Sequence, residues 1–122
     1  MSKTILTVDD SRTMRDMLRQ ALCDAGHDVI QAEDGVAGVE ALAAAGPIDV
    51  IITDINMPRL DGYGFIGEVR SHPRHRATPI LVPSTESDPA RKARAREAGA
   101  TGWIVKPFDP AKLLAAVGKV SP

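Results

Sequence analysis

The sequence predicts an α/β fold in which a five-stranded parallel sheet is covered by helices on both faces. Five short apolar runs, rich in Val and Ile, are spread along the chain. The segments between them repeat apolar residues every three or four positions, which is the spacing of an amphipathic helix. Strands that alternate with helices form parallel sheets, and 122 residues are enough for one domain with a buried core.

Two strand–helix units are expected in the first third of the chain. Strand-like runs cover 4–8 and 28–32, and each leads into a segment with helical spacing. Ser11 is placed to cap the first helix and Gly26 to end it. A serine side chain accepts the free N–H groups of a helix start, and glycine adopts the left-handed backbone that closes a helix. The second helix stops at Gly46.

Three more units follow the same pattern. The run 48–53 is apolar and β-branched, as expected of a strand covered on both faces. Pro58 and the pair Asp61-Gly62 indicate that a loop follows it. Further strands are expected at 80–82 and 103–105, and helices around 65–69, 88–98 and 113–120.

Composition and charge narrow the class of protein. The net charge of −1 gives no argument for nucleic-acid binding. Cys23 is the only cysteine, so no internal disulfide can form, which favours a reducing compartment. No apolar run approaches the ~20 residues of a membrane span, and the N-terminus has no signal-peptide pattern. We therefore expect a cytoplasmic protein without membrane insertion.

Three carboxylates follow the first and third expected strands. Asp9 and Asp10 come directly after Val8, and Asp54 comes after Thr53. The carboxyl ends of parallel strands share one edge of the sheet, where ligands of such sheets bind. Taken alone, an acidic pair after a strand can equally be a turn with a helix cap. Three carboxylates in one crevice repel one another unless a cation joins them, and oxygen-only ligands suit Mg²⁺.

Other polar side chains end the fourth and fifth strands. Ser84 and Thr85 follow the fourth, and Lys106 follows the fifth directly before Pro107. The Ser84 hydroxyl can donate to a phosphoryl oxygen or be satisfied by nearby backbone groups, and this segment leaves both interpretations open. Lys106 is either a solvated surface lysine or a partner of Asp54. The proline after it favours the second interpretation, because it indicates a specified turn.

Taken in order, these segments make the chain resemble the receiver domains of two-component response regulators, most of all the single-domain chemotaxis (CheY-type) regulators. The resemblance implies a flavodoxin-like sheet of order 2-1-3-4-5 with five helices, forming a single receiver domain over 1–122 without an output domain. Receivers of this kind are among the known examples of ligand binding at strand ends, so the fold expectation is not independent of the resemblance. It is carried by Val8-Asp9-Asp10-Ser11, Thr53-Asp54-Ile55-Asn56-Met57-Pro58 with Asp61-Gly62, Ser84-Thr85-Glu86, and 99–108.

The resemblance implies a role for each acidic residue. Asp54 matches the aspartate that accepts a phosphoryl group from the phosphohistidine of a histidine kinase. Mg²⁺ is implied to be the cofactor, bound by the carboxylates of Asp10 and Asp54 and by the backbone carbonyl of Asn56. Asp9 would act mostly through a metal-bound water.

The remaining implied roles concern the phosphoryl group and the response to it. Lys106 and the backbone of Thr85 are implied to contact the phosphoryl group. Ser84 would be the switch hydroxyl and Trp103 the aromatic switch residue. Such a protein is a phosphoacceptor and not an enzyme with a separate substrate, since it catalyses only its own phosphorylation and dephosphorylation.

One position departs from the family pattern. Receivers usually carry an aliphatic residue before the switch hydroxyl, where this chain has Pro83. Proline has no N–H for the sheet, so one hydrogen bond of an internal strand should be missing. We expect loosening or a bend directly before Ser84.

Several other residues have simple structural interpretations. Taken alone, Trp103 would be a packed strand residue, and only the resemblance favours a switch. The basic residues of the 88–98 helix are expected to form a solvated face that can also dock a partner. These basic residues are Arg91, Lys92, Arg94 and Arg96. The histidines lack metal-ligand spacing and are expected at the surface: His27, His72 and His75.

The leading functional hypothesis is a monomeric switch that a histidine kinase phosphorylates and that then binds a protein target, such as a flagellar motor switch protein. A phosphatase is a further candidate partner. The alternative is a phosphorelay intermediate or phosphate sink without a motor target. The absence of an output domain after Val120 fits both hypotheses. A pseudo-receiver that binds proteins constitutively is disfavoured, because the set of site residues is complete.

Overall fold

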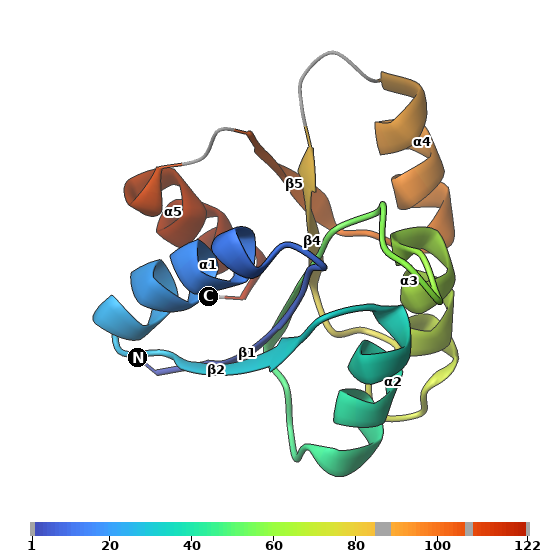
Figure 1. Cartoon of the computed structure of the whole chain (residues 1–122), viewed down its shortest axis with the longest axis horizontal. Coiled ribbons are helices and arrows are strands. Elements are labelled where there is room, and N and C mark those ends of the chain that lie inside the picture. Colours follow the sequence, from blue (N-terminus) through green and yellow to red (C-terminus); the bar gives the residue numbers. More distant parts are fainter. Residues whose placement is uncertain (1, 85–88, 107–108, 122) are drawn as a thin grey trace.

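Strands and helices alternate along the chain in the computed structural model, which describes residues 2–84, 89–106 and 109–121 (Figure 1). The strands form one parallel sheet in the order β2-β1-β3-β4-β5, which confirms the predicted topology. The elements are β1 (Thr4–Val8), α1 (Arg12–Asp24), β2 (Asp28–Ala32), α2 (Gly35–Ala44), β3 (Val50–Thr53), α3 (Gly62–Ser71), β4 (Ile80–Ser84), α4 (Pro89–Ala98), β5 (Gly102–Val105) and α5 (Pro110–Val120).

The sheet separates two apolar cores, because successive residues of a strand point to opposite faces. In β1, Leu6 and Val8 belong to the core beneath α2, α3 and α4, whereas Ile5 belongs to the core beneath α1 and α5. Figure 1 shows these two groups of helices on opposite sides of the sheet. All of β3 is buried, as expected of a strand covered on both faces.

Helix ends form where the sequence indicated. Ser11 accepts the Met14 N–H at 3.2 Å and caps α1. Gly26, with a φ of +90°, ends the same helix. Aspartates cap three further helices by accepting a backbone N–H three residues on: Asp34 for α2, Asp61 for α3 and Asp109 for α5.

Pro83 interrupts the sheet on one side only. The pairing of β4 with β5 continues through Pro83 to Ser84, but the pairing with β3 ends at Leu81. The Pro79 carbonyl accepts a hydrogen bond from β3. Because alternate residues of a strand bond to the same neighbour, position 83 also faces β3. The hydrogen bond predicted to be missing therefore belongs to the seam between β3 and β4.

His75 corrects the expectation that all histidines lie at the surface, since only 2% of its surface is exposed. Its Nδ1 lies 3.1 Å from the Thr78 hydroxyl. Arg70 donates to the carbonyls of His75, Thr78 and Gly99, and so holds the connection between α3 and β4 closed over the ring. Burial lowers the pKa of His75. The sequence did not show this, because the closing contacts join a side chain to distant backbone carbonyls.

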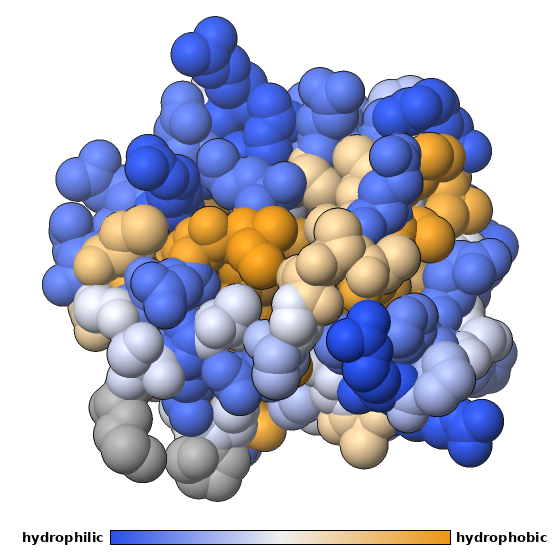
Figure 2. Space-filling view, turned by 90° about the horizontal axis from the view of Figure 1, so that it is seen from below, coloured by the Kyte–Doolittle hydropathy of each residue, from blue (hydrophilic) through white to orange (hydrophobic). Residues whose placement is uncertain are grey.

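The edge strand β2 leaves part of both cores near the surface. Its Val29 and Ile30 are half-buried and pack against the two cores. Figure 2 views the molecule from below and shows hydrophobic residues gathered in a band across this face. No helix in the described part of the chain is long and apolar enough to span a membrane.

Candidate functional site

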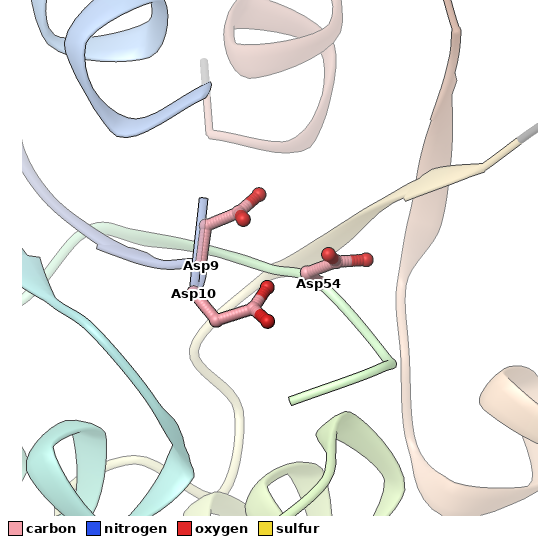
Figure 3. A group of neighbouring side chains, drawn as sticks. All are labelled: Asp9, Asp10 and Asp54. Carbon is pink, nitrogen blue, oxygen red and sulfur yellow. The ribbon is translucent and has the colours of Figure 1, made fainter. Parts of the chain in front are cut away.

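Three carboxylates meet at the carboxyl edge of the sheet, as predicted (Figure 3). Asp9 and Asp10 follow β1, and Asp54 follows the neighbouring strand β3. One oxygen from each carboxylate lies within 4.8 Å of the other two. The Asp54 N–H donates to the Val8 carbonyl at 2.9 Å, which extends the ladder one residue beyond the strand. The adjacency of β1 and β3 therefore sets the spacing of the acids.

Asp9 is the buried member of the group, with 1% of its surface exposed. Its Oδ1 accepts the Ser11 N–H at 2.8 Å, and its carbonyl accepts from Arg15 Nη1 at 2.7 Å. Burial raises the pKa of the Asp9 carboxyl, and the charge of Asp54 adds to this rise, against the Ser11 hydrogen bond. The ionised group is therefore held at a cost that a nearby cation would remove.

Asp54 lies between the acidic pair and Lys106. Its Oδ1 accepts the Ile55 N–H at 2.8 Å and lies 3.9 Å from Lys106 Nζ, which confirms the predicted pairing. Gly62 lets the first turn of α3 approach this strand end closely. A Cβ atom there would collide with the Asp54 carbonyl oxygen, so only glycine fits.

A cavity of about 150 Å³ lies beside Asp54. It is enclosed by the ends of β3, β4 and β5 and by the first half of α4. The cavity thus brings the Asp54 carboxylate, the amine of Lys106 and the ring of Trp103 around one space. Its lining includes Asp54, Asn56, Pro83, Lys92, Trp103 and Lys106.

Ser84 and Thr85 are further residues expected near the phosphoryl group, and the structure describes only one of them. Ser84 ends β4 opposite Val105, at the same edge of the sheet as Lys106. This backbone position agrees with the expectation for the switch hydroxyl, whose contact stays a prediction. Thr85 and Pro107 lie outside the described residues.

Trp103 lies against α4 through two cations. Lys92 Nζ is 5.1 Å and Arg96 Cζ is 5.0 Å from the centre of the half-exposed ring. Arg94 lies 4.0 Å from the ring centre of Tyr63 on α3. Arg91, Arg94 and Arg96 are exposed, as expected of a basic face on this helix, whereas Lys92 is half-buried. Three of these four cations also contact aromatic rings, which the sequence did not indicate.

The carboxylate group fits a small divalent cation. Opposite ligands of Mg²⁺ are about 4.2 Å apart, and the three oxygens already lie within 4.8 Å of one another. All the candidate ligands are hard oxygen atoms, as Mg²⁺ prefers. The amine of Lys106, 3.9 Å from Asp54 Oδ1, adds a positive charge beside this group. When bound, Mg²⁺ would be held by Asp9, Asp10 and Asp54.

A further ion pair next to the site was not found from the sequence. Arg59, in the connection between β3 and α3, donates from Nε to Asp34 Oδ2 at 2.7 Å and from Nη2 to Oδ1 at 3.1 Å. The sequence signal at Asp34-Gly35 is that of a helix cap. Nothing in it pairs this aspartate with a residue 25 positions later.

The family model for the response regulator receiver domain matches residues 5–118. The chain therefore belongs to this family, whose members are phosphoacceptor signalling proteins, and the acidic group and the order of the strands agree with it.

Individual proteins and solved structures are also similar to this chain over most of its length. The chain is 42% identical to chemotaxis protein CheY1 of Helicobacter pylori over 107 residues, which cover 87% of this chain and 86% of that protein. The chemotaxis response regulator CheY4 of Vibrio cholerae superposes with a TM-score of 0.92 at 41% identity, covering 98% of this chain and 99% of that one. The receiver domain of sensor histidine kinase PA1611 from Pseudomonas aeruginosa superposes with a TM-score of 0.89 at 25% identity, covering 98% of this chain and 97% of that one. That domain was solved with a magnesium ion coordinated in its active site cleft.

Asp9→Asn should raise the melting temperature of the metal-free protein at neutral pH. The fold raises the pKa of Asp9, so the folded state binds this proton more readily than the unfolded state. The ionised carboxylate therefore destabilises the fold, and asparagine removes the charge while keeping the acceptor for Ser11. As pH falls from neutral toward about 4, Asp9 becomes protonated and the advantage of the variant should vanish.

Saturating Mg²⁺ should reverse the order of the two melting temperatures. Binding at 100 times Kd stabilises the folded state by about 2.7 kcal/mol, and the variant has lost one carboxylate of the site. Circular dichroism melts with a chelator and with Mg²⁺ measure both effects, with Asp24→Asn on exposed helix surface as the control. A metal-free variant no more stable than the unchanged protein would contradict the expectation.

Proposed function

We propose that Asp54 accepts a phosphoryl group from the phosphohistidine of a histidine kinase, in a reaction that depends on Mg²⁺. The observation that carries the proposal is the placement of the Asp54 carboxylate in its cavity. Lys106 Nζ lies 3.9 Å away on one side, and carboxylate oxygens of Asp9 and Asp10 lie within 4.8 Å on the other. Lys106 and a Mg²⁺ ion held by the carboxylates would place positive charge on both sides of a transferring phosphoryl group, as its transfer requires.

In the proposed reaction, an oxygen of Asp54 attacks phosphorus in line with the bond to the histidine nitrogen. The new O–P bond forms as the P–N bond breaks, and the imidazole leaves with its electron pair. Mg²⁺, when bound, supplies charge neutralisation on the phosphoryl oxygens. The chain itself supplies orientation, because the Ile55 N–H donates to the carboxylate at 2.8 Å and Lys106, directly after β5, faces it.

We further propose that the protein acts in the cytoplasm as a chemotaxis switch whose phosphorylated form binds a motor switch protein. Support comes from identities of 42% and 41% to the chemotaxis proteins of H. pylori and V. cholerae, against 31% and 25% to the receiver domains of two histidine kinases. The fold is shared by all of them, so the sequence identity carries this preference. A phosphate sink is the competing role.

We propose that Trp103 is the element that responds to phosphorylation. Lys92 lines the cavity of Asp54 and also lies over the Trp103 ring. An acyl phosphate would place a charge of about −2 close to the Lys92 amine. The phosphate would then compete with the Trp103 ring for this amine. Each cation–π contact at such a site is worth about 0.5–1 kcal/mol, so losing one is enough to shift the population of ring positions.

Asp54→Asn should abolish labelling by a small radiolabelled phosphodonor in the presence of Mg²⁺. The amide is not a nucleophile for phosphorus, so incorporation should fall to background. Asp61→Asn is the matched control, because it changes a carboxylate in the same connection and keeps the cap of α3. Labelling of the Asp54 variant at the level of the unchanged protein would remove the assignment.

Trp103 fluorescence should change when the protein is phosphorylated. Trp103 is the only tryptophan, so the signal has one source. Release from Lys92 and Arg96 should alter both emission and access to acrylamide. The Asp54→Asn variant under the same conditions should show no change beyond that caused by Mg²⁺. An unchanged spectrum in a fully phosphorylated sample would count against an aromatic switch.

A pull-down with phosphorylated and unphosphorylated protein should separate the two proposed roles. A chemotaxis switch should retain a motor switch protein at least about tenfold better after phosphorylation, which corresponds to 1.4 kcal/mol of coupling. A phosphate sink should exchange phosphoryl groups with histidine kinases and retain no motor protein in either state. The second pattern would leave Asp54 as the acceptor but overturn the motor role.

A further inference from the structure

The connection between β3 and α3 is tightly closed next to the proposed metal site. The Ile55 carbonyl accepts the Gly62 N–H at 2.8 Å, which joins its two ends. Ile55 and Met57 are buried in the core, whereas Asn56 between them is exposed and lines the cavity of Asp54. The position of the Asn56 backbone therefore depends on how this connection is held.

Arg59 lies at the centre of a tight turn in this connection. The Leu60 N–H donates to the Pro58 carbonyl at 2.8 Å across a three-residue turn, and the φ of Arg59 at its centre is +67°. A γ-turn with positive φ is rare and strained. Among the described residues, Arg59 is the only one other than glycine with positive φ. Glycine would adopt this backbone without strain, so the arginine side chain contributes something that offsets it.

The side chain of Arg59 ties this turn to the start of α2. Its guanidinium makes two hydrogen bonds, of 2.7 and 3.1 Å, to the Asp34 carboxylate, which is 4% exposed. The same carboxylate accepts the Ala37 N–H at 2.8 Å and caps α2. Gly35 leaves no room for a side chain against the Leu60 carbonyl, so helix and turn are in direct contact. The turn is thus held through the half-exposed Arg59 side chain by two hydrogen bonds to a buried carboxylate on another element.

We propose that the Arg59–Asp34 ion pair positions the connection between β3 and α3 for metal binding. Arg59 is a positioning residue, because it acts through the loop and contacts neither metal nor phosphoryl group. By holding the strained turn, the pair keeps the Asn56 backbone and the Asp54 carboxylate in register at one edge of the cavity. This inference rests on the proposed function, in which that edge binds Mg²⁺.

Two single substitutions and their combination test the proposal. Arg59→Asn removes the ion pair but tolerates positive φ. Asp34→Asn removes the ion pair but keeps the capping oxygen for Ala37. Each should weaken Mg²⁺ binding by about tenfold, the lower end of what partners outside the ligand shell contribute. The double variant should bind no more weakly than either single one, because both remove the same interaction.

Calorimetric titration with MgCl₂ gives the Kd, and thermal unfolding without metal shows whether each variant is folded. If Arg59→Asn does not fold, Arg59→Gly takes its place, because glycine removes the strain together with the pair. Arg12→Gln is the control. It removes an arginine from an exposed pair, with Asp16 at 4.0 Å, and should leave the Kd unchanged.

The possible outcomes differ in whether each substitution strengthens or weakens Mg²⁺ binding. Simple electrostatics predicts tighter Mg²⁺ binding after loss of Arg59 and weaker binding after loss of Asp34, and this pattern would overturn the proposal. A lower melting temperature with an unchanged Kd would also overturn it, by showing that the pair only stabilises the fold. If the unchanged protein does not bind Mg²⁺, the proposed metal site fails and this inference with it. Weaker binding in both variants supports it.

Discussion

The fold has to accommodate the electrostatic repulsion among Asp9, Asp10 and Asp54. Adjacent parallel strands bring their oxygens within 4.8 Å, and the burial of Asp9 makes its charge costly. The apolar cores on both faces of the sheet supply the stability that tolerates this arrangement. A site built in this way is stabilised most by a ligand that neutralises its charge, so the proposed binding of Mg²⁺ would also stabilise the fold.

The elements on the two sides of the acids are held by different contacts. On one side, the connection after β3 is closed by the Ile55–Gly62 hydrogen bond and by the Arg59–Asp34 pair. On the other side, the pairing between β3 and β4 ends early, and α4 contacts Trp103 through long cationic side chains. The seam interrupted at Pro83 thus lies between the strand that leads to Asp54 and the part of the molecule proposed to respond to phosphorylation.

The fold and most of the candidate site could be predicted from the sequence. The strand order came with the family resemblance, and the structure confirms it. Periodicity placed the strands, and Asp9, Asp10 and Asp54 had to share an edge once the sheet was parallel. His75 and Arg59 could not be predicted in the same way. The burial of His75 depends on Arg70 reaching distant carbonyls, and Arg59 is held by a partner 25 positions earlier.

From the amino-acid sequence alone one can predict the class of fold, the edge of the sheet where the candidate site lies and the residue types that form it. These features follow from the hydrophobic periodicity within each strand and helix and from the order of the elements along the chain. The three-dimensional arrangement was needed to show which side of β4 loses its hydrogen bond, how closely Lys106 approaches Asp54 and what holds the strained turn at Arg59. Those features depend on distances between elements far apart in the chain, which packing of the complete sheet and its helices sets.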